Sequence, residues 1–323
     1  MNQLRIGVLG CANIAKRSMI PAILTINDFK LVAVASRIED EAKEFADQFD
    51  CEPVVGYQNL LDKEDIDVIY MPLPTGMHEE WVIKALEAGK HVHVEKSLAM
   101  SYESAQKMVD LAKEKGLLLM ENFMFLYHNQ HQLVKDLIVK GAIGEIRCFR
   151  SSFGFPPLDA NNFRYNKALG GGALLDAAAY TVRASQLFLG KELRVVAATL
   201  NHEDKEVDVY GGAYLKSVDN RFSEVAFGFD NFYQCNYELW GSKGKITAHR
   251  AFTPRADYKP VITLEQQGEL INYEAKPENH FISILNEFKR CVLENDFEEK
   301  YVEILNQSRL LEELKEKSTS KYV

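Results

Sequence analysis

The segment LRIGVLGCANIA, residues 4–15, joins an apolar strand to a helix through a turn of small residues. Gly10 allows a sharp turn after the strand, and Ala15 lets the helix pack closely on the sheet. Free N–H groups at the start of such a helix attract phosphate oxygens. Ala12 stands where the usual pattern has glycine, so an ordinary tight turn is the alternative interpretation. The segment predicts a dinucleotide pyrophosphate site at Gly10, Cys11, Ala12, Asn13 and Ile14.

The end of the second apolar run indicates which dinucleotide binds. NAD-binding folds usually place an acid there for the ribose hydroxyls. Here Ser36 and Arg37 follow the run, and the first acid is Glu39. A guanidinium can neutralise a ribose 2′-phosphate and hydrogen-bond to it. We therefore expect Ser36 and Arg37 to contact the cofactor, with NADP favoured over NAD. The alternative is that Arg37 is a surface residue that caps the next helix.

Short apolar runs alternate with helical segments through the first third of the chain. This alternation is typical of βαβ units, in which helices cover both faces of a parallel sheet. We therefore predict an α/β Rossmann domain over residues 1–122. Its predicted strands are residues 4–9, 31–35, 68–70, 91–94 and 117–121, and its predicted helices are 13–24, 39–49, 79–88 and 102–115.

Longer, often alternating strands follow after about residue 144. The dipeptides Asp219-Asn220 and Asp230-Asn231 suggest hairpin turns between them. We expect residues 123–323 to form an α+β domain with a large, mainly antiparallel open sheet, which binds substrate and mediates oligomerisation. Its C-terminal helix is expected to pack back on the first domain. The predicted strands are 145–153, 193–201, 207–216, 223–229, 233–239 and 261–265, and the helices are 128–140, 172–189, 278–294 and 301–317.

Composition excludes several classes of protein. The formal net charge of −9 argues against nucleic-acid binding, which needs a concentrated basic surface. No apolar run approaches the roughly 20 residues that span a bilayer, and the first residues lack a signal-peptide pattern. The five cysteines are scattered and form no CxxC pair. We expect a cytoplasmic protein with reduced thiols.

A charged pair, Glu95-Lys96, follows the predicted strand at residues 91–94. Open α/β sheets bind ligands at the carboxyl ends of their strands. A lysine there can polarise a carbonyl, and Glu95 could orient it. In isolation, a surface ion pair would be the default interpretation.

A second informative stretch begins with three glycines at residues 170–172. Asp176, Tyr180 and Arg183 follow at i, i+4 and i+7, which would place them on one face of a helix. A carboxylate and a phenol on one face could bind a sugar and transfer a proton. On spacing alone, a buried structural tyrosine is the commoner case.

No metal site is expected. His128 and His131 are three residues apart on a predicted helix with Glu121 upstream, but no third ligand is evident.

These motifs together resemble the Gfo/Idh/MocA oxidoreductases, the glucose–fructose oxidoreductase and inositol dehydrogenase group. The resemblance covers nearly the whole chain and rests on the Gly10 turn, residues 79–92, Glu95-Lys96 and residues 170–180. Within the family the chain looks most like the nucleotide-sugar (TDP-hexose) 3-ketoreductases. That similarity is carried by residues 120–131, 149–157, 162–165, 228–230 and 239–244.

The resemblance implies roles for individual residues. Lys96 would be the active-site lysine, Tyr180 the proton donor to the forming alkoxide, and Asp176 a contact to sugar hydroxyls. The antiparallel sheet would form a homo-oligomer, a dimer or a tetramer. Ser97 departs from the family pattern, which has proline there, and Leu126 stands where many relatives have arginine. Further expected contacts are Pro72, Leu73, Pro74, His78, Glu95 and Lys96 to the cofactor, and Asn122, Arg164, Tyr165 and Arg183 to the substrate.

The sequence therefore predicts an NAD(P)-dependent oxidoreductase that transfers hydride between a nicotinamide and a sugar carbonyl. The expected reaction is reduction of a nucleotide-linked keto-deoxysugar. One alternative is a dehydrogenase of free sugars, polyols or trans-dihydrodiols. Another is a dinucleotide-binding regulator without activity, although such proteins tend to lack the lysine.

Overall fold

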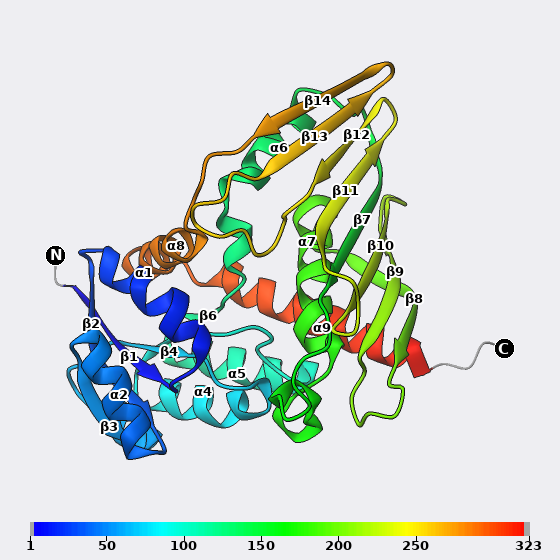
Figure 1. The fold of residues 1–323 in the computed structure, drawn as a ribbon. Coiled ribbons are helices and arrows are strands. Elements are labelled where there is room, and N and C mark those ends of the chain that lie inside the picture. The colour runs from blue at the N-terminus through cyan, green and yellow to red at the C-terminus, as the bar shows by residue number, and fades with distance from the viewer. Residues whose placement is uncertain (1–2, 320–323) are drawn as a thin grey trace. The chain divides into compact units, whose positions relative to one another are not determined.

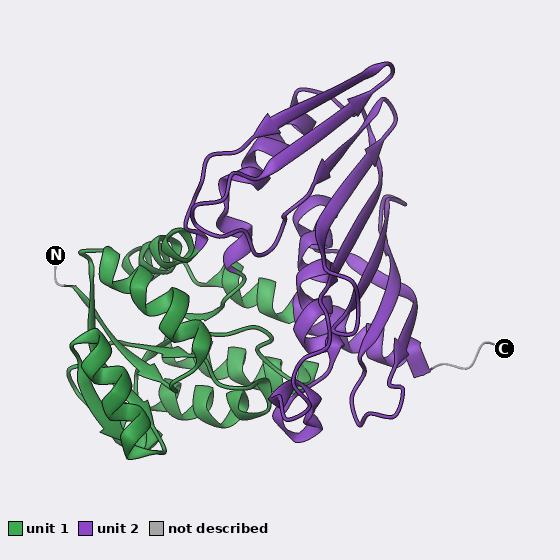
Figure 2. Cartoon of the chain, in the orientation of Figure 1, with its two compact units in different colours: residues 1–123, 281–305 green, residues 124–280, 306–323 purple. Residues whose placement is uncertain are grey.

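The computed structural model describes residues 3–319, which fall into two compact units (Figure 1 and Figure 2). Unit 1 comprises residues 1–123 and 281–305, and unit 2 comprises residues 124–280 and 306–323. Unit 1 is therefore built from two separate stretches of the chain. Within residues 3–319, every helix is too short or too polar to span a bilayer.

A six-stranded parallel sheet forms the centre of unit 1, with strand order β3-β2-β1-β4-β5-β6. This order and the connecting helices confirm the predicted Rossmann fold. The strands are β1 (Leu4–Leu9), β2 (Phe29–Ser36), β3 (Glu52–Val55), β4 (Val68–Met71), β5 (His91–Val94) and β6 (Leu119–Glu121). The helices are η1 (Ala15–Met19), α1 (Ile20–Thr25), α2 (Glu39–Phe49), α3 (Tyr57–Leu61), η2 (Thr75–Met77), α4 (His78–Glu87) and α5 (Tyr102–Lys115).

Local sequence explains where these elements begin and end. Val8 and Leu9 in β1 are fully buried, as expected for a sheet covered on both faces. The Ser101 hydroxyl caps α5 by accepting a hydrogen bond from the Ser104 amide at 3.2 Å. Gly116 ends the same helix in the left-handed region, at φ +64°.

The second stretch of unit 1 packs against the Rossmann sheet. It contains most of α8 (His280–Glu294) and the start of α9 (Glu298–Thr319). The Phe288 ring stacks on His93 of β5 with centroids 5.1 Å apart. Lys289 forms an ion pair with Asp28 at 2.7 Å. Residues 281–305 therefore supply part of the core of unit 1.

Unit 2 contains an eight-stranded sheet with order β14-β13-β12-β11-β7-β10-β9-β8. Only the β7–β10 pairing is parallel, so the sheet is mostly antiparallel, as predicted. Its strands are β7 (Ile146–Gly154), β8 (Leu193–Asn201), β9 (Tyr210–Ser217), β10 (Phe222–Gly228), β11 (Gln234–Gly241), β12 (Gly244–Ala248), β13 (Val261–Gln266) and β14 (Glu269–Glu274). The remaining elements are η3 (Met124–Tyr127), α6 (Asn129–Val139), η4 (Phe163–Tyr165), η5 (Lys167–Leu169), η6 (Leu174–Ala178) and α7 (Ala179–Leu189).

One of the two predicted hairpins is wrong. Asp219-Asn220 does connect the antiparallel pair β9 and β10. Asp230-Asn231 lies between β10 and β11, but these strands flank β7 on opposite sides and do not pair with each other. A turn dipeptide marks a reversal of the chain. It does not specify whether the two flanking strands pair with each other or with a third strand between them.

Helix α7 covers one face of this sheet. The Phe188 ring lies 5.7 Å from Phe149 of β7 and 4.9 Å from Tyr237 of β11. Both partner rings are fully buried. The amide of Gln307 in α9 donates to the Ala179 carbonyl at 2.9 Å, which ties the end of the chain to the start of α7. The tyrosine-bearing helix is therefore held between the sheet and α9.

Candidate active site

The turn after β1 has the geometry of a phosphate-binding loop. Gly10 has φ +122°, a conformation that side-chain-bearing residues rarely adopt. A Cβ added there would lie 2.8 Å from Leu73 Cδ2. The Gly10 amide donates to the Ala35 carbonyl at 3.0 Å, which fixes the turn beside the end of β2. Only glycine fits this position.

The helix that follows leaves its first N–H groups open to a ligand. It starts at Asn13 and Ile14 and includes the π-helical turn η1. No side chain caps its N-terminus, and its first turn contains no acid. Ala12 is not among the described residues with positive φ, so alanine is conformationally acceptable there. These features fit a dinucleotide pyrophosphate.

Cys11 packs beneath this turn. Its Sγ lies 3.9 Å from the Ala35 carbonyl oxygen and 3.8 Å from that of Glu41. Burial, with the Glu41 charge as a smaller contribution, raises the pKa of Cys11 to about 12. The thiol therefore stays protonated near neutral pH and is not a nucleophile.

At the end of β2, the Ser36 hydroxyl donates to Glu41 Oε2 at 2.7 Å and accepts from the Ile38 amide at 3.1 Å. The side chain of Ser36 is 3% exposed and is engaged within the protein. Arg37 is exposed, and its charge partly offsets the rise in the pKa of the Tyr57 hydroxyl that burial causes. Of the two predicted nucleotide contacts, Arg37 is the one whose side chain faces solvent.

The segment after β4 forms the neighbouring wall. Leu73 faces Gly10, Pro72 is buried, and Pro74 is half-buried. His78 is fully buried, and its expected contact to the cofactor stays a prediction. Its Nε2 lies 2.7 Å from the Leu73 carbonyl, and its Nδ1 lies 3.0 Å from the Ser97 carbonyl. His78 therefore links the Leu73 segment to the loop that follows Lys96.

Glu95 and Lys96 lie at the carboxyl end of β5. Glu95 Oε1 accepts hydrogen bonds from the Tyr70 hydroxyl at 2.7 Å and the Asn122 amide at 2.5 Å. Burial raises the pKa of Glu95, while these two hydrogen bonds and the Lys96 charge oppose that rise. Asn122 is 0% exposed and its amide is directed to Glu95, and its expected contact to the substrate stays a prediction. The peptide bond between Lys96 and Ser97 is cis.

Tyr180 lies in unit 2, near the N-terminal end of α7. Its ring contacts Phe153 at a centroid distance of 4.9 Å and both Phe125 and Phe252 at 5.7 Å. The side chain is 6% exposed. An aromatic shell of this kind restricts the phenol to one orientation.

Asp176 and Arg164 form an ion pair, with Arg164 Nε donating to Asp176 Oδ2 at 2.6 Å. The Tyr165 hydroxyl accepts from the Leu158 amide at 3.1 Å, and its ring contacts Phe229 at 5.3 Å. Arg164 and Tyr165 were expected to contact substrate. Each has a partner within unit 2, and their expected contacts to the substrate stay predictions.

Arg183 is 5% exposed on α7, and its expected contact to the substrate stays a prediction. The spacing argument assumed a regular α-helix. The π-helical turn η6 adds a residue to the first turn and changes which side chains share a face.

Asp208 is a residue that the sequence did not single out. It is 7% exposed, and its Oδ2 accepts from the Leu174 amide at 2.6 Å. The Asp208 carbonyl accepts from the Ala173 amide at 2.8 Å. Asp208 thus caps the helix that carries Asp176 and Tyr180. A Cβ on Gly172, at φ +115°, would lie 2.5 Å from the Asp208 carboxylate, which explains a glycine beside the cap.

Among residues 3–319, no three His, Cys, Asp or Glu side chains are grouped so that they could hold a metal ion.

Comparisons with known proteins agree with this geometry. Residues 4–123 match a family model described as an oxidoreductase family with an NAD-binding Rossmann fold, and residues 131–247 match the GFO/IDH/MocA C-terminal domain. The chain is 45% identical to a dTDP-3,4-didehydro-2,6-dideoxy-alpha-D-glucose 3-reductase of Saccharopolyspora spinosa, over 89% of this chain and 87% of the relative. It is 43% identical to a reductase of the same name from Actinomadura kijaniata, over 94% and 91%.

A solved structure extends the comparison to three dimensions. A 3-ketoreductase from Actinomadura kijaniata, in complex with NADP and TDP-benzene, superposes with a TM-score of 0.95 and 42% identity over 98% of both chains. Fold, motifs and relatives agree, and the chain belongs to the Gfo/Idh/MocA family of oxidoreductases.

Proposed function

We propose that this chain reduces the 3-keto group of a dTDP-linked keto-deoxysugar with NADPH. The observation that carries the proposal is the full-length match to 3-ketoreductases, one of which binds NADP and TDP-benzene. A lysine at the carboxyl edge of the Rossmann sheet and a tyrosine on a capped helix supply the groups that carbonyl reduction needs. The bound nicotinamide supplies the hydride.

Lys96 and Tyr180 act on the same carbonyl oxygen in this proposal. The Lys96 ammonium stabilises the negative charge that develops on the oxygen, and the Tyr180 hydroxyl donates the proton. Glu95, held by Tyr70 and Asn122, orients the ammonium. The Phe153, Phe125 and Phe252 rings fix the phenol and exclude water around it.

The preference for NADP over NAD is assigned to Arg37. Its side chain is exposed and pairs with no carboxylate in the described part of the chain, so its charge is available for a 2′-phosphate. The Ser36–Glu41 hydrogen bond keeps the Ser36 hydroxyl within the protein and supports the turn from which Arg37 projects.

The proposal is tested by NADPH oxidation with a dTDP-linked 3-keto-2,6-dideoxyhexose, in parallel with D-xylose oxidation by NADP⁺. Turnover of the nucleotide sugar but not of xylose supports it, and the reverse supports a free-sugar dehydrogenase. Tyr180→Phe and Lys96→Ala should each reduce kcat about a hundredfold or more while leaving NADP⁺ affinity nearly unchanged. Tyr214→Phe on an exposed strand position is the matched control. Activity near wild type in both active-site variants would contradict the assignment.

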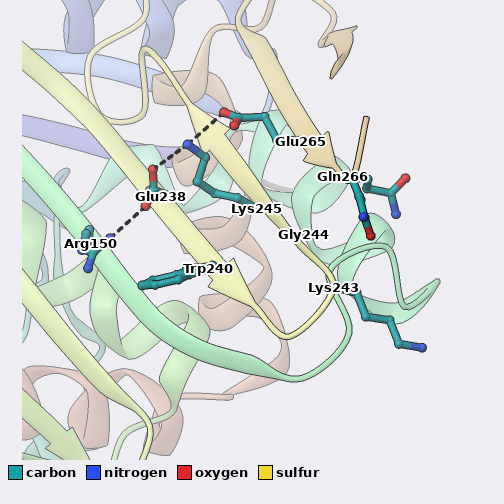
Figure 3. A pocket seen from close by; sticks show the side chains of 9 residues that line it. Arg150, Glu238, Trp240, Lys243, Gly244, Lys245, Glu265 and Gln266 are labelled. Carbon is teal, nitrogen blue, oxygen red and sulfur yellow. Dashed lines mark hydrogen bonds and ion pairs between the residues drawn. The ribbon is translucent and has the colours of Figure 1, made fainter. Parts of the chain in front are cut away.

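We also propose that the chain forms a homo-oligomer through the face of the eight-stranded sheet opposite α7. An ion-pair ladder crosses this face: Arg150 lies 2.6 Å from Glu224 and 3.3 Å from Glu238, and Lys245 lies 3.3 Å from Glu238 and 2.9 Å from Glu265. Figure 3 shows the part from Arg150 to Glu265.

The exposed Trp240 adjoins this ladder, with the Arg150 guanidinium 5.2 Å from its ring (Figure 3). Alternating charges with an exposed aromatic can meet their own copy across a two-fold axis. Trp240→Glu should reduce the mass of the particle measured by light scattering, whereas Val139→Glu, on the exposed end of α6, should not.

All five cysteines are free thiols. We propose a reducing compartment, the cytoplasm, as the place where the enzyme works.

A further inference from the structure

His78 is a fully buried histidine of unit 1 whose two ring nitrogens both face backbone carbonyl oxygens. It begins α4, directly after the turn η2. Its Nε2 lies 2.7 Å from the Leu73 carbonyl oxygen. Its Nδ1 lies 3.0 Å from the Ser97 carbonyl oxygen and 3.1 Å from that of Leu98. One side chain therefore bridges the segment after β4 and the loop after β5.

The Leu73 side of this bridge borders the dinucleotide turn. Leu73 Cδ2 lies 2.8 Å from the position that a Cβ on Gly10 would occupy, so the leucine side chain packs against the glycine of that turn. Pro72 and Pro74 flank Leu73 and restrict the backbone on either side of it. The carbonyl that faces His78 therefore belongs to a stiff segment in the wall of the proposed cofactor site.

The other side of the bridge holds the loop that begins with Lys96. Ser97 and Leu98 follow the lysine directly, and they are 2% and 1% exposed. The Leu98 amide donates to Glu121 Oε1 at 2.8 Å, so β6 holds this loop from one direction. His78 holds the same loop from the direction of the cofactor wall. The backbone next to Lys96 is therefore fixed by two side chains from different elements.

The chemistry of imidazole determines how these contacts are made. Carbonyl oxygens only accept hydrogen bonds, so each contact needs an N–H group of the ring. Contacts to both segments at once require two N–H groups, whereas a neutral ring donates to one segment and packs against the other. Burial lowers the pKa of His78, and the hydrogen bonds to the Leu73, Leu98 and Ser97 carbonyls oppose that effect. In either form the ring fills the space between the two segments and excludes water from it.

We propose that His78 is a positioning residue for carbonyl reduction, because it holds the loop of Lys96 against the wall of the cofactor site and so sets where the lysine ammonium lies. His78 touches neither the sugar nor the hydride donor in this role and acts through Lys96. A displaced ammonium would stabilise the developing negative charge less well. The inference rests on the proposed function, since it assigns the placement of the lysine that acts there.

A double-mutant cycle separates positioning of Lys96 from a general structural role. Single-turnover oxidation of NADPH by the dTDP-linked 3-keto sugar is measured for wild type, His78→Phe, Lys96→Ala and the double variant. His78→Phe should lower the rate about tenfold or more in the wild-type background. In the Lys96→Ala background it should change the rate less than about twofold, because no ammonium remains to be positioned. Equal factors in both backgrounds, or no change in either, would overturn the proposal. If His78→Phe does not fold, His78→Leu replaces it in the same cycle.

Hydrogen–deuterium exchange of the protein without cofactor gives a second readout. His78→Phe should speed amide exchange in residues 97–99 about tenfold or more, because the loop loses one of its two holds. The matched control is His91→Phe at the amino end of β5, where the half-buried His91 Nδ1 accepts from the Leu118 amide at 2.9 Å. This control should change neither the single-turnover rate nor exchange in residues 97–99.

The two proposals fail in different ways. If wild type does not oxidise NADPH with the keto sugar, the proposed function fails. If wild type is active and residues 97–99 exchange equally fast in wild type and His78→Phe, the role of His78 alone is refuted.

Discussion

Lowering the pH should destabilise this protein through its buried histidines, and His131 gives the clearest case. Its ring is 1% exposed, and its Nδ1 lies 2.9 Å from the Tyr237 hydroxyl. Burial, with smaller contributions from the charges of His128 and Lys135, lowers the pKa of His131 to about 3. Burial likewise lowers the pKa values of His93 and His280 to about 3.

The direction in which pH changes the free energy of unfolding follows from proton binding. A histidine in the unfolded chain has a pKa of about 6.5, so below that pH the unfolded state binds a proton that the folded state does not. The free energy of unfolding therefore falls as the pH drops from about 6.5 toward 3. Between about pH 7 and about pH 5 one such histidine removes about 2 kcal/mol, and the three together about three times as much.

The assay is urea unfolding of wild type and His131→Gln at several pH values in that interval. The variant is less stable at neutral pH, but its loss of stability on acidification should be about 2 kcal/mol smaller than that of wild type. Carboxylates with lowered pKa values, such as Asp67 and Glu287, are present in both proteins and cancel in the comparison. The exposed His202→Gln serves as the control. If wild type and His131→Gln lose stability in parallel, the buried neutral imidazole is not the cause.

Three further predictions concern the site. Asp208→Ala leaves the Leu174 amide without its acceptor, so the free energy of unfolding, measured by heat or urea, should fall by about 1–3 kcal/mol. Because the same helix carries Tyr180, kcat should also fall. Gly10→Ala combines a left-handed φ with a 2.8 Å approach to Leu73, so NADPH affinity measured by fluorescence titration should fall about tenfold or more; unchanged affinity would mean the loop does not cradle the pyrophosphate. Arg37→Ala should weaken NADPH binding about tenfold and leave NADH binding nearly unchanged, and equal losses for both cofactors would contradict the 2′-phosphate contact.

Much of the fold could be predicted from periodicity and capping alone. The bounds of β1, α2 and α5 were predicted to the residue, because each is a long periodic segment or is closed by a clear stop signal. The strand β3 (Glu52–Val55) and the helix α3 (Tyr57–Leu61) were missed because they are short and carry little apolar pattern. The strand β12 (Gly244–Ala248) was missed because it is also short, and β14 (Glu269–Glu274) because it is largely exposed and shows no alternation of buried and exposed residues.

The candidate site was harder to predict, since side-chain partners are chosen by tertiary structure. Sequence identified Lys96 and Tyr180 as chemically suitable groups, but it could not indicate that Asn122 is enclosed beside Glu95. Asp208 lies 34 residues after Leu174, whose amide it caps, so local sequence does not reveal this cap. Gly172 was the indication in the sequence that another group lies close to the start of this helix, because a glycine directly before a helix often accommodates a close neighbour.

The division of unit 1 into two stretches has a consequence for biosynthesis. Residues 1–123 leave the ribosome long before residues 281–305, which carry the Phe288 ring that covers His93. The nascent Rossmann sheet must therefore persist without this cover until residues 281–305 have been translated. A fragment ending at residue 123 would expose the same apolar surface permanently, so the nucleotide-binding half is not an independent module that can be produced by a single cut.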